Sequence, residues 1–193
     1  HLILRNRGDP EIANNDGFTP FQYTILNEKY NLARLLLKWS ADIDSQDNTG
    51  CSSLYLAVGA EKIWAVNFLL ENCARVDLPN FQKLTPLMKA CQIGFEKGID
   101  IVRVLIKRRA DVRFHDVDGY TALMYASSAG QLLTVRLLLE TDGENIINQR
   151  ANDGTNALYL AASEGHADVV QALIEAGVEV DARRRSDKRT PLM

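Results

Sequence analysis

"DGYTALMYASSAG", residues 118–130, combines a turn, a helix cap and a short helix in thirteen residues. Closely similar stretches begin at Asp16 ("DGFTPFQYTILNE") and at Asp153 ("DGTNALYLAASEG"). The small hydroxyl or amide residue that opens each copy recurs at Thr19, Ser52, Thr85, Thr121, Asn156 and Thr190, at intervals of 33, 33, 36, 35 and 34 residues. A fixed period near 33 residues is typical of a protein built from stacked repeats.

Each of these marker residues predicts the start of a helix, because its side chain can accept a hydrogen bond from a free amide of the first turn. Proline follows the marker at positions 20, 86 and 191, where its missing N–H is not needed. A second, more aliphatic segment comes next, such as "NLARLLLKW" (31–39), with apolar residues spaced for one helix face. We therefore expect two short helices per repeat, which bury their apolar faces by stacking on neighbouring repeats.

The segments between repeats predict β-hairpin tips. Three of them end in Asp/Asn-x-x-Gly, a turn signature, at 14–17, 47–50 and 116–119. The third hairpin has Lys83 at the glycine position, which leaves its shape open. Extra residues near 94–100 and 141–148 lengthen the third and fourth repeats.

Composition narrows the class of protein. A net charge of −3 over 193 residues does not favour a nucleic-acid or membrane-surface partner. No apolar run approaches the ~18 residues of a membrane helix, so we expect no membrane insertion. Cys51, Cys73 and Cys91 have no C-x-x-C spacing, and we expect reduced, buried thiols in an intracellular protein of the cytoplasm or nucleus.

The sequence contains no recognisable catalytic arrangement. Its three histidines are His1, His115 and His166, and we expect His166 to form a structural hydrogen bond. His115 and Asp116 near Asp118 could suggest a metal or acid–base site, but polar residues are ordinary at a hairpin tip and the remaining calcium-loop ligands are missing. We predict that the chain is not an enzyme and that it holds no metal and no cofactor.

The order turn, T-P-L-H-x-A, helix, G-H, helix, G-A-x-V-N resembles the ankyrin repeat, best of all in "TNALYLAASEGHADVVQALIEAGVEVDA" (155–182). The resemblance implies an all-α ankyrin-repeat solenoid with β-hairpin-like fingers, and its ends look cut from a longer array. The expected single array has partial repeats at 1–13 and 185–193 and full repeats at 14–46, 47–79, 80–115, 116–150 and 151–184. The family's His after T-P-L is absent, which implies that packing replaces its polar link; the position holds Gln22, Tyr55, Met88, Met124, Tyr159 and Met193.

The resemblance also implies a function. Ankyrin arrays bind protein partners on their finger tips and on the exposed ends of the first helices, which together form a concave face. Carried over residue by residue, this predicts partner-binding residues Phe18, Phe81, Leu84, Ile93, Val117, Asp118, Tyr120, Asn152 and Asp153. Five apolar members fall in two adjacent repeats and predict an exposed patch that binds a protein or peptide: Phe81, Leu84, Ile93, Val117 and Tyr120. The alternative is that Phe81 and Leu84 fold back into the stack. We expect the chain itself to be a monomer.

Three other interpretations stay open. The array could be the regulatory or targeting part of a longer enzyme or channel, in contact with its own catalytic part. Trp39 and Trp64 could form a contact on the convex side, or Trp64 could lie over neighbouring aliphatic side chains. Two basic clusters (103–113 and 183–189) could bind nucleic acid in a salt-dependent way, but nearby acidic residues and the absence of interleaved aromatics disfavour this.

Overall fold

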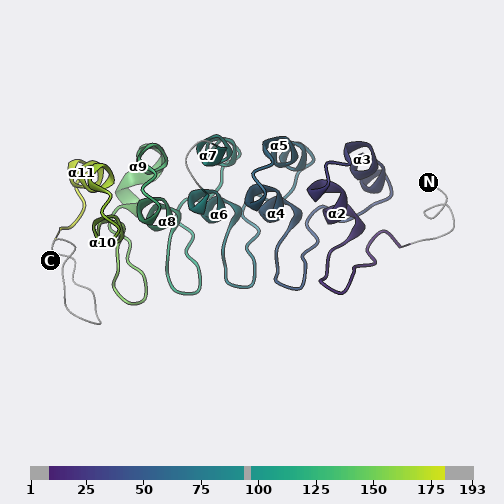
Figure 1. The fold of residues 1–193 in the computed structure, drawn as a ribbon, viewed down its shortest axis with the longest axis horizontal. Helices are drawn as coiled ribbons and strands as arrows, with labels where there is room; N and C mark the ends of the chain where they lie inside the picture. Colours follow the sequence, from purple (N-terminus) through teal and green to yellow (C-terminus); the bar gives the residue numbers. More distant parts are fainter. Residues whose placement is uncertain (1–8, 94–96, 181–193) are drawn as a thin grey trace.

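The computed structural model describes residues 9–93 and 97–180 of the chain. Over these ranges the helices form two rows, with the first helix of each pair in one row and the second helix in the other (Figure 1). This arrangement confirms the predicted all-α solenoid. The pairs are α2 (Pro20–Leu26) and α3 (Tyr30–Lys38), α4 (Ser53–Gly59) and α5 (Ile63–Glu71), α6 (Pro86–Gln92) and α7 (Lys97–Lys107), α8 (Ala122–Ser128) and α9 (Leu132–Ile146), and α10 (Ala157–Ser163) and α11 (Ala167–Glu175).

The predicted helix caps are confirmed in all five described pairs. Each cap residue has an extended backbone, and its side chain accepts a hydrogen bond from the amide three residues later. The capping residues are Thr19, Ser52, Thr85, Thr121 and Asn156. Thr190, the sixth marker, lies outside the described residues.

The core runs along the stack of first helices. Each of these helices contacts the first helices of the adjacent pairs, in the order α2, α4, α6, α8 and α10. One equivalent position in each helix holds a large apolar residue that is at most 1% exposed: Phe21, Leu54, Leu87, Leu123 and Leu158. No repeat can bury this residue without its neighbours, so stability comes from the interfaces between repeats.

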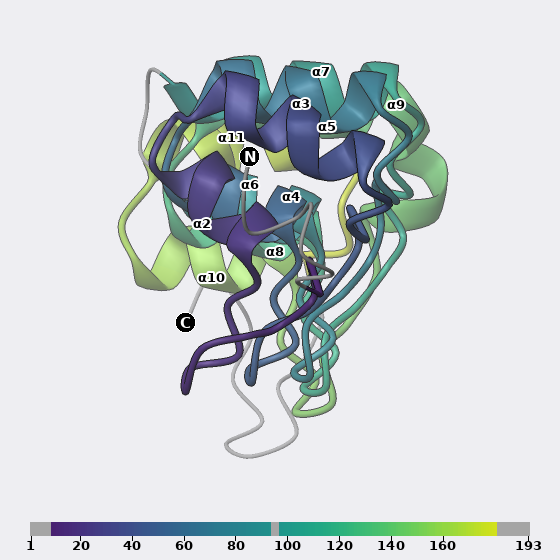
Figure 2. The same ribbon diagram turned by 90° about the vertical axis from the view of Figure 1, so that its right-hand side faces the viewer.

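The hairpins form a row of fingers that project to one side of the helices (Figure 2). In each finger, the amide of the last turn residue donates to the carbonyl of the first, at 2.9 to 3.2 Å. One backbone hydrogen bond joins each finger to the next: Asn48 to Asp16, Phe81 to Thr49, Val117 to Gln82 and Asn152 to Asp118, at 2.9 to 3.2 Å. The finger tips therefore form a continuous surface across all five repeats.

The third and fourth repeats, which contain extra residues, keep the same arrangement of helices and fingers. Lys83 adopts the positive φ (59°) that glycine normally supplies, so the third hairpin closes like the others. The extra residues of the fourth repeat lengthen α9, which kinks at Asp142 (φ −157°, ψ 42°). Those of the third repeat fall partly at 94–96, outside the described residues.

Two expectations about polar and thiol groups are wrong. Gln22 does not replace the family's polar link by packing, because its side chain accepts from the Thr19 amide (3.0 Å) and donates to the carbonyls of Ser45 (3.1 Å) and Cys51 (3.0 Å). Cys51 and Cys91 are buried as expected, but Cys73, in the turn that follows α5, is exposed. His166 does form a structural bond, from Nε2 to the Ser128 carbonyl at 3.0 Å.

Candidate functional site

Two of the predicted partner-binding residues are exposed apolar side chains on neighbouring fingers. Phe81 is 65% exposed and Val117 is 49% exposed. Their fingers are joined by the hydrogen bond from the Val117 amide to the Gln82 carbonyl (3.1 Å). The Phe81 ring lies against Gly50 of the preceding finger, where an added Cβ would come within 2.6 Å of the ring. We call Phe81 and Val117 the fingertip pair.

The other three members of the predicted exposed patch are not freely exposed. Ile93 is buried (9% exposed) at the end of α6, while Leu84 and Tyr120 are half-buried against the core. Tyr120 also packs on Tyr125, with 5.9 Å between ring centroids. The expectation of a five-residue exposed patch is therefore wrong, and only the fingertip pair remains. The alternative, in which Phe81 and Leu84 fold back into the stack, holds for Leu84 but not for Phe81.

The polar residues of the prediction help to build the fingers. Asn152 donates from its side chain to the Val117 carbonyl at 3.0 Å. The Asp153 carboxylate accepts from the amide (2.9 Å) and hydroxyl (2.8 Å) of Thr155. Phe18 is half-buried, and Asp118 is exposed next to Val117. An exposed apolar pair with polar neighbours is the arrangement expected of an anchor inside a polar rim.

A buried carboxylate, which the sequence analysis did not single out for this role, holds the fourth finger against α8. Asp116 is 5% exposed, and one of its oxygens accepts from the amides of Asp118 (2.9 Å) and Tyr120 (2.8 Å). Its other oxygen accepts from the Tyr125 hydroxyl. Burial, followed by this bond to Asp116, raises the pKa of Tyr125. These bonds hold the turn that carries Val117 in place against α8.

Both oxygens of Asp116 are therefore occupied, one by amides of the finger and the other by Tyr125 of α8. His115 beside it contacts the Asp116 carbonyl at 3.1 Å. Across residues 9–93 and 97–180, no group of three His, Cys, Asp or Glu side chains is arranged to hold a metal ion. The same described part of the chain has no helix long and apolar enough to cross a membrane.

On the convex side, Trp64 is packed rather than free. Its half-buried ring contacts the edge of Tyr30 and lies 6.0 Å from the Phe68 ring. Trp39 is 41% exposed at the end of α3. In the first basic cluster, Arg108 donates to the Leu70 carbonyl at 2.7 Å. The second basic cluster, at 183–189, lies outside the described residues.

These features define a class: a helical repeat solenoid with a row of hairpin fingers. The family model for ankyrin repeats (3 copies) matches residues 1–80, 65–150 and 142–193, and the chain belongs to the ankyrin repeat family. The solved ankyrin repeat domain of Bcl-3 superposes with a TM-score of 0.84 at 25% identity, over 100% of this chain and 84% of that one. Ankyrin repeats are non-catalytic modules that bind protein partners.

Relatives come from different kinds of protein. The chain is 32% identical to the "Ankyrin repeat and KH domain-containing protein mask-1" of Caenorhabditis elegans, over 92% of this chain and 6% of that protein. It is 28% identical to the mouse "B-cell lymphoma 3 protein homolog", over 95% of this chain and 41% of that protein. It is 30% identical to the human "Transient receptor potential cation channel subfamily A member 1", over 84% of this chain and 15% of that protein. The chain thus spans less than half the length of each of these relatives.

Proposed function

We propose that this array recognises a protein or peptide partner on its concave face, with the fingertip pair as the apolar anchor. The observation that supports this most is the exposure of Phe81 (65%) and Val117 (49%) on adjacent, hydrogen-bonded fingers. Apolar side chains of this size are usually buried, and when they gather on a rigid surface they mark interaction sites. The array acts as a monomeric scaffold, without catalysis and without a cofactor.

The fingers supply the rigidity that recognition requires. Phe81 and Val117 each donate a backbone hydrogen bond to the preceding finger, so the backbone that carries these side chains does not have to be ordered by the partner. Binding to a preformed surface avoids the entropy cost of ordering a loop. Asp118, Asn152 and Asp153 form the polar rim of the proposed site, and the half-buried Phe18 adds an apolar contact at the first finger.

A pull-down from cell extract tests the proposal, with the wild-type chain compared to a Phe81→Asp, Val117→Asp double variant. Val117 rather than Tyr120 is the second substituted residue, because replacement of Tyr120, which packs on Tyr125, would disturb the finger. A Tyr23→Asp variant is the matched control, since Tyr23 is 63% exposed on α2 and outside the pair. Proteins that are retained by wild type and control but lost from the double variant support the fingertip site. Equal retention by all three proteins contradicts it.

A second function is favoured by the relatives. Besides the channel, the chain is 28% identical to the "Probable E3 ubiquitin-protein ligase XBOS32" of rice, over 77% of this chain and 36% of that protein. In this alternative, the array is the regulatory or targeting part of a longer enzyme or channel. The retained protein would then be another part of the same polypeptide, which mass spectrometry of the pull-down identifies directly.

A further inference from the structure

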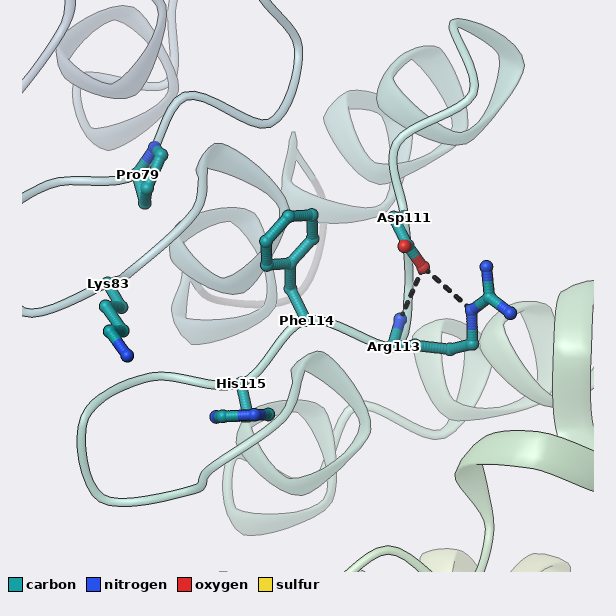
Figure 3. Close-up of a pocket in the computed structure, with 6 residues that line it drawn as sticks. All are labelled: Pro79, Lys83, Asp111, Arg113, Phe114 and His115. Atoms are coloured by element: carbon teal, nitrogen blue, oxygen red, sulfur yellow. Dashed lines mark hydrogen bonds and ion pairs between the residues drawn. The ribbon is translucent and has the colours of Figure 1, made fainter.

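A second candidate site lies between the third and fourth fingers and uses none of the predicted partner-binding residues. It is a cavity of about 450 Å³, lined by Pro79, Lys83, Asp111, Arg113, Phe114 and His115 (Figure 3). Pockets that take ligands are typically ~300–1,000 Å³. We call these six residues the interfinger pocket.

Phe114 gives the pocket an apolar wall. In Figure 3 its ring lies in the middle of the six residues, with Lys83 and His115 on one side and the Asp111–Arg113 pair on the other. The ring is 41% exposed. The matching place in the neighbouring repeats holds Ser45 and Gln149, or the buried Leu78. The stack therefore does not require an aromatic ring here, and the exposed part of Phe114 is free to contact a ligand.

The charge of the pocket is positive. Its one carboxylate, Asp111, already accepts from the Arg113 amide (3.0 Å) and Nε (3.1 Å). Arg113 also forms an ion pair with Asp142, with 3.7 Å between Nε and the carboxylate oxygen. None of the ion pairs within residues 9–93 and 97–180 involves Lys83. An uncompensated ammonium beside an aromatic wall complements a ligand that carries a carboxylate next to an apolar group.

A smaller cavity continues the site along the array. It measures about 150 Å³, lies against the fourth and fifth fingers and shares His115 with the interfinger pocket. Gln149 lines it, and the side-chain oxygen of Gln149 is buried without a hydrogen-bond partner in the described structure. A buried acceptor without a donor is costly, so this oxygen is suited to receive an N–H group from a ligand.

The geometry points to the binding of an extended acidic peptide segment of a partner protein across the third, fourth and fifth fingers. An apolar side chain of the peptide lies against Phe114, a carboxylate pairs with Lys83, and a backbone N–H donates to the Gln149 oxygen. A peptide fits better than a nucleic acid, because a row of phosphates requires several cations, whereas Arg113 is paired with acidic residues and, among the described residues, Lys83 is the one cation of the pocket that is not. The site does not depend on the fingertip pair.

Defined peptides test this inference by fluorescence anisotropy on the full 193-residue chain. The probe is a labelled hexapeptide with four glutamates around a central Leu-Phe pair. In one control peptide lysines replace the glutamates, and in another alanines replace the Leu-Phe pair. We expect the first peptide to bind more tightly than both controls, and its affinity to fall as salt is raised. Equal binding of the lysine peptide, or tighter binding of an oligothymidine strand at the same residues, overturns the inference.

Variants locate the peptide. Lys83→Gln should weaken binding about fivefold, in line with an exposed ion pair of up to ~1 kcal/mol. Phe114→Gln, which introduces the residue found at position 149, should weaken it roughly 30-fold, as expected for loss of an aromatic anchor. Lys38→Gln, an exposed lysine at the end of α3, is the control and should have no effect.

Amide chemical-shift mapping on the wild-type chain covers the case in which Phe114→Gln does not fold. Shifts at 80–83, 111–115 and 149–150 support the site, whereas shifts confined to other fingers contradict it. A Phe81→Ser, Val117→Ser variant, which removes the apolar pair and adds no charge beside Lys83, should bind the acidic peptide as wild type does. The fingertip site and the interfinger pocket can therefore fail independently of each other.

Discussion

Lys83 occupies a turn position that is glycine in the other four described fingers. Its φ of 59° lies in the left-handed region, where glycine is unstrained and most other residues are not. We expect Lys83→Gly to stabilise the protein by about 1 kcal/mol, because the relief of this strain exceeds the entropy lost by glycine on folding. Urea denaturation followed by circular dichroism measures the change in the free energy of unfolding.

Lys83→Ala separates the backbone effect from the charge. Alanine removes the ammonium group, as glycine does, but keeps a Cβ at the same positive φ. We therefore expect Lys83→Ala to have no stabilising effect. If both variants are stabilised by the same amount, the gain comes from lost charge, and the account of strain at Lys83 is wrong.

Gln22 is the second residue at which a single side chain decides local stability. It is fully buried, and its side-chain amide accepts from the Thr19 amide and donates to the carbonyls of Ser45 and Cys51, on either side of the second finger tip. Gln22→Met, which introduces the residue found at positions 88 and 124, leaves these groups unpaired and should cost about 2 kcal/mol. Faster hydrogen exchange of the Thr19 amide would accompany the loss. Met88→Leu, an apolar exchange of similar volume at the equivalent position of α6, is the control and should cost less than ~1.5 kcal/mol.

At this scale the sequence predicted residues with a local role better than residues with a long-range one. Thr19 and its equivalents were predicted as caps because the capping bond spans only three residues. The bonds of Gln22 reach residues 23 and 29 positions away, which no local pattern reveals. Ile93 was expected on the surface by alignment with regular repeats. It is buried instead at the end of α6, where its carbonyl accepts a hydrogen bond from the Gln131 side chain.

At the scale of elements, the bond from Tyr125 of α8 to Asp116 ties the fourth finger to its helix. Since burial and this bond raise the pKa of Tyr125 above its ordinary value near 10, folding favours the neutral phenol. The resulting stability is full below pH 10 and is lost as the pH rises towards the folded-state pKa. We expect the wild-type chain to lose stability above pH 10 more steeply than Tyr125→Phe, which has no proton to lose at this position.

The absorbance of tyrosinate during an alkaline titration provides the measurement. In the wild-type chain the Tyr125 signal should develop only well above pH 10, as should that of Tyr55, whose pKa burial raises to about 12. Tyr125→Phe should remove the Tyr125 signal. Tyr23→Phe removes an exposed phenol and serves as the comparison. If the two variants change the titration over the same pH range, Tyr125 is not held by Asp116.

The elements themselves were largely predictable, because each helix pair repeats the same cap and the same apolar spacing. The length of α9 was not. The extra residues "TDGENIIN" (141–148) contain Gly143 and polar residues that suggest a loop, yet they continue α9 to Ile146 beyond a kink at Asp142. Ile146 and Ile147 are buried in the core, so tertiary packing overrides the weak local preference for a helix. Phe81 and Val117 were predicted from the ankyrin resemblance and from polarity, as part of a larger patch, but separating them from Leu84 and Tyr120 required the packing of those side chains.

At the scale of the whole molecule, each repeat is held by its neighbours. First helices contact one another along the order α2, α4, α6, α8 and α10, so damage should spread through adjacent interfaces. Leu87 in the middle and Leu158 near the end occupy equivalent, fully buried positions. A leucine-to-alanine change at either position should lower the free energy of unfolding of its repeat by about 2–5 kcal/mol.

The position of the substituted repeat should decide how many other repeats lose stability. Stability in a repeat array is a sum of repeat and interface terms. Leu158→Ala should therefore lower hydrogen-exchange protection in α10 and α11 while α2 to α5 keep theirs. Leu87→Ala should weaken both interfaces of α6, uncouple the two halves of the array and lower protection on either side of it. Hydrogen exchange resolved by mass spectrometry distinguishes these patterns. A uniform loss of protection in both variants would mean that the array unfolds as one unit, and that a partner bound at the third and fourth fingers stabilises all repeats equally.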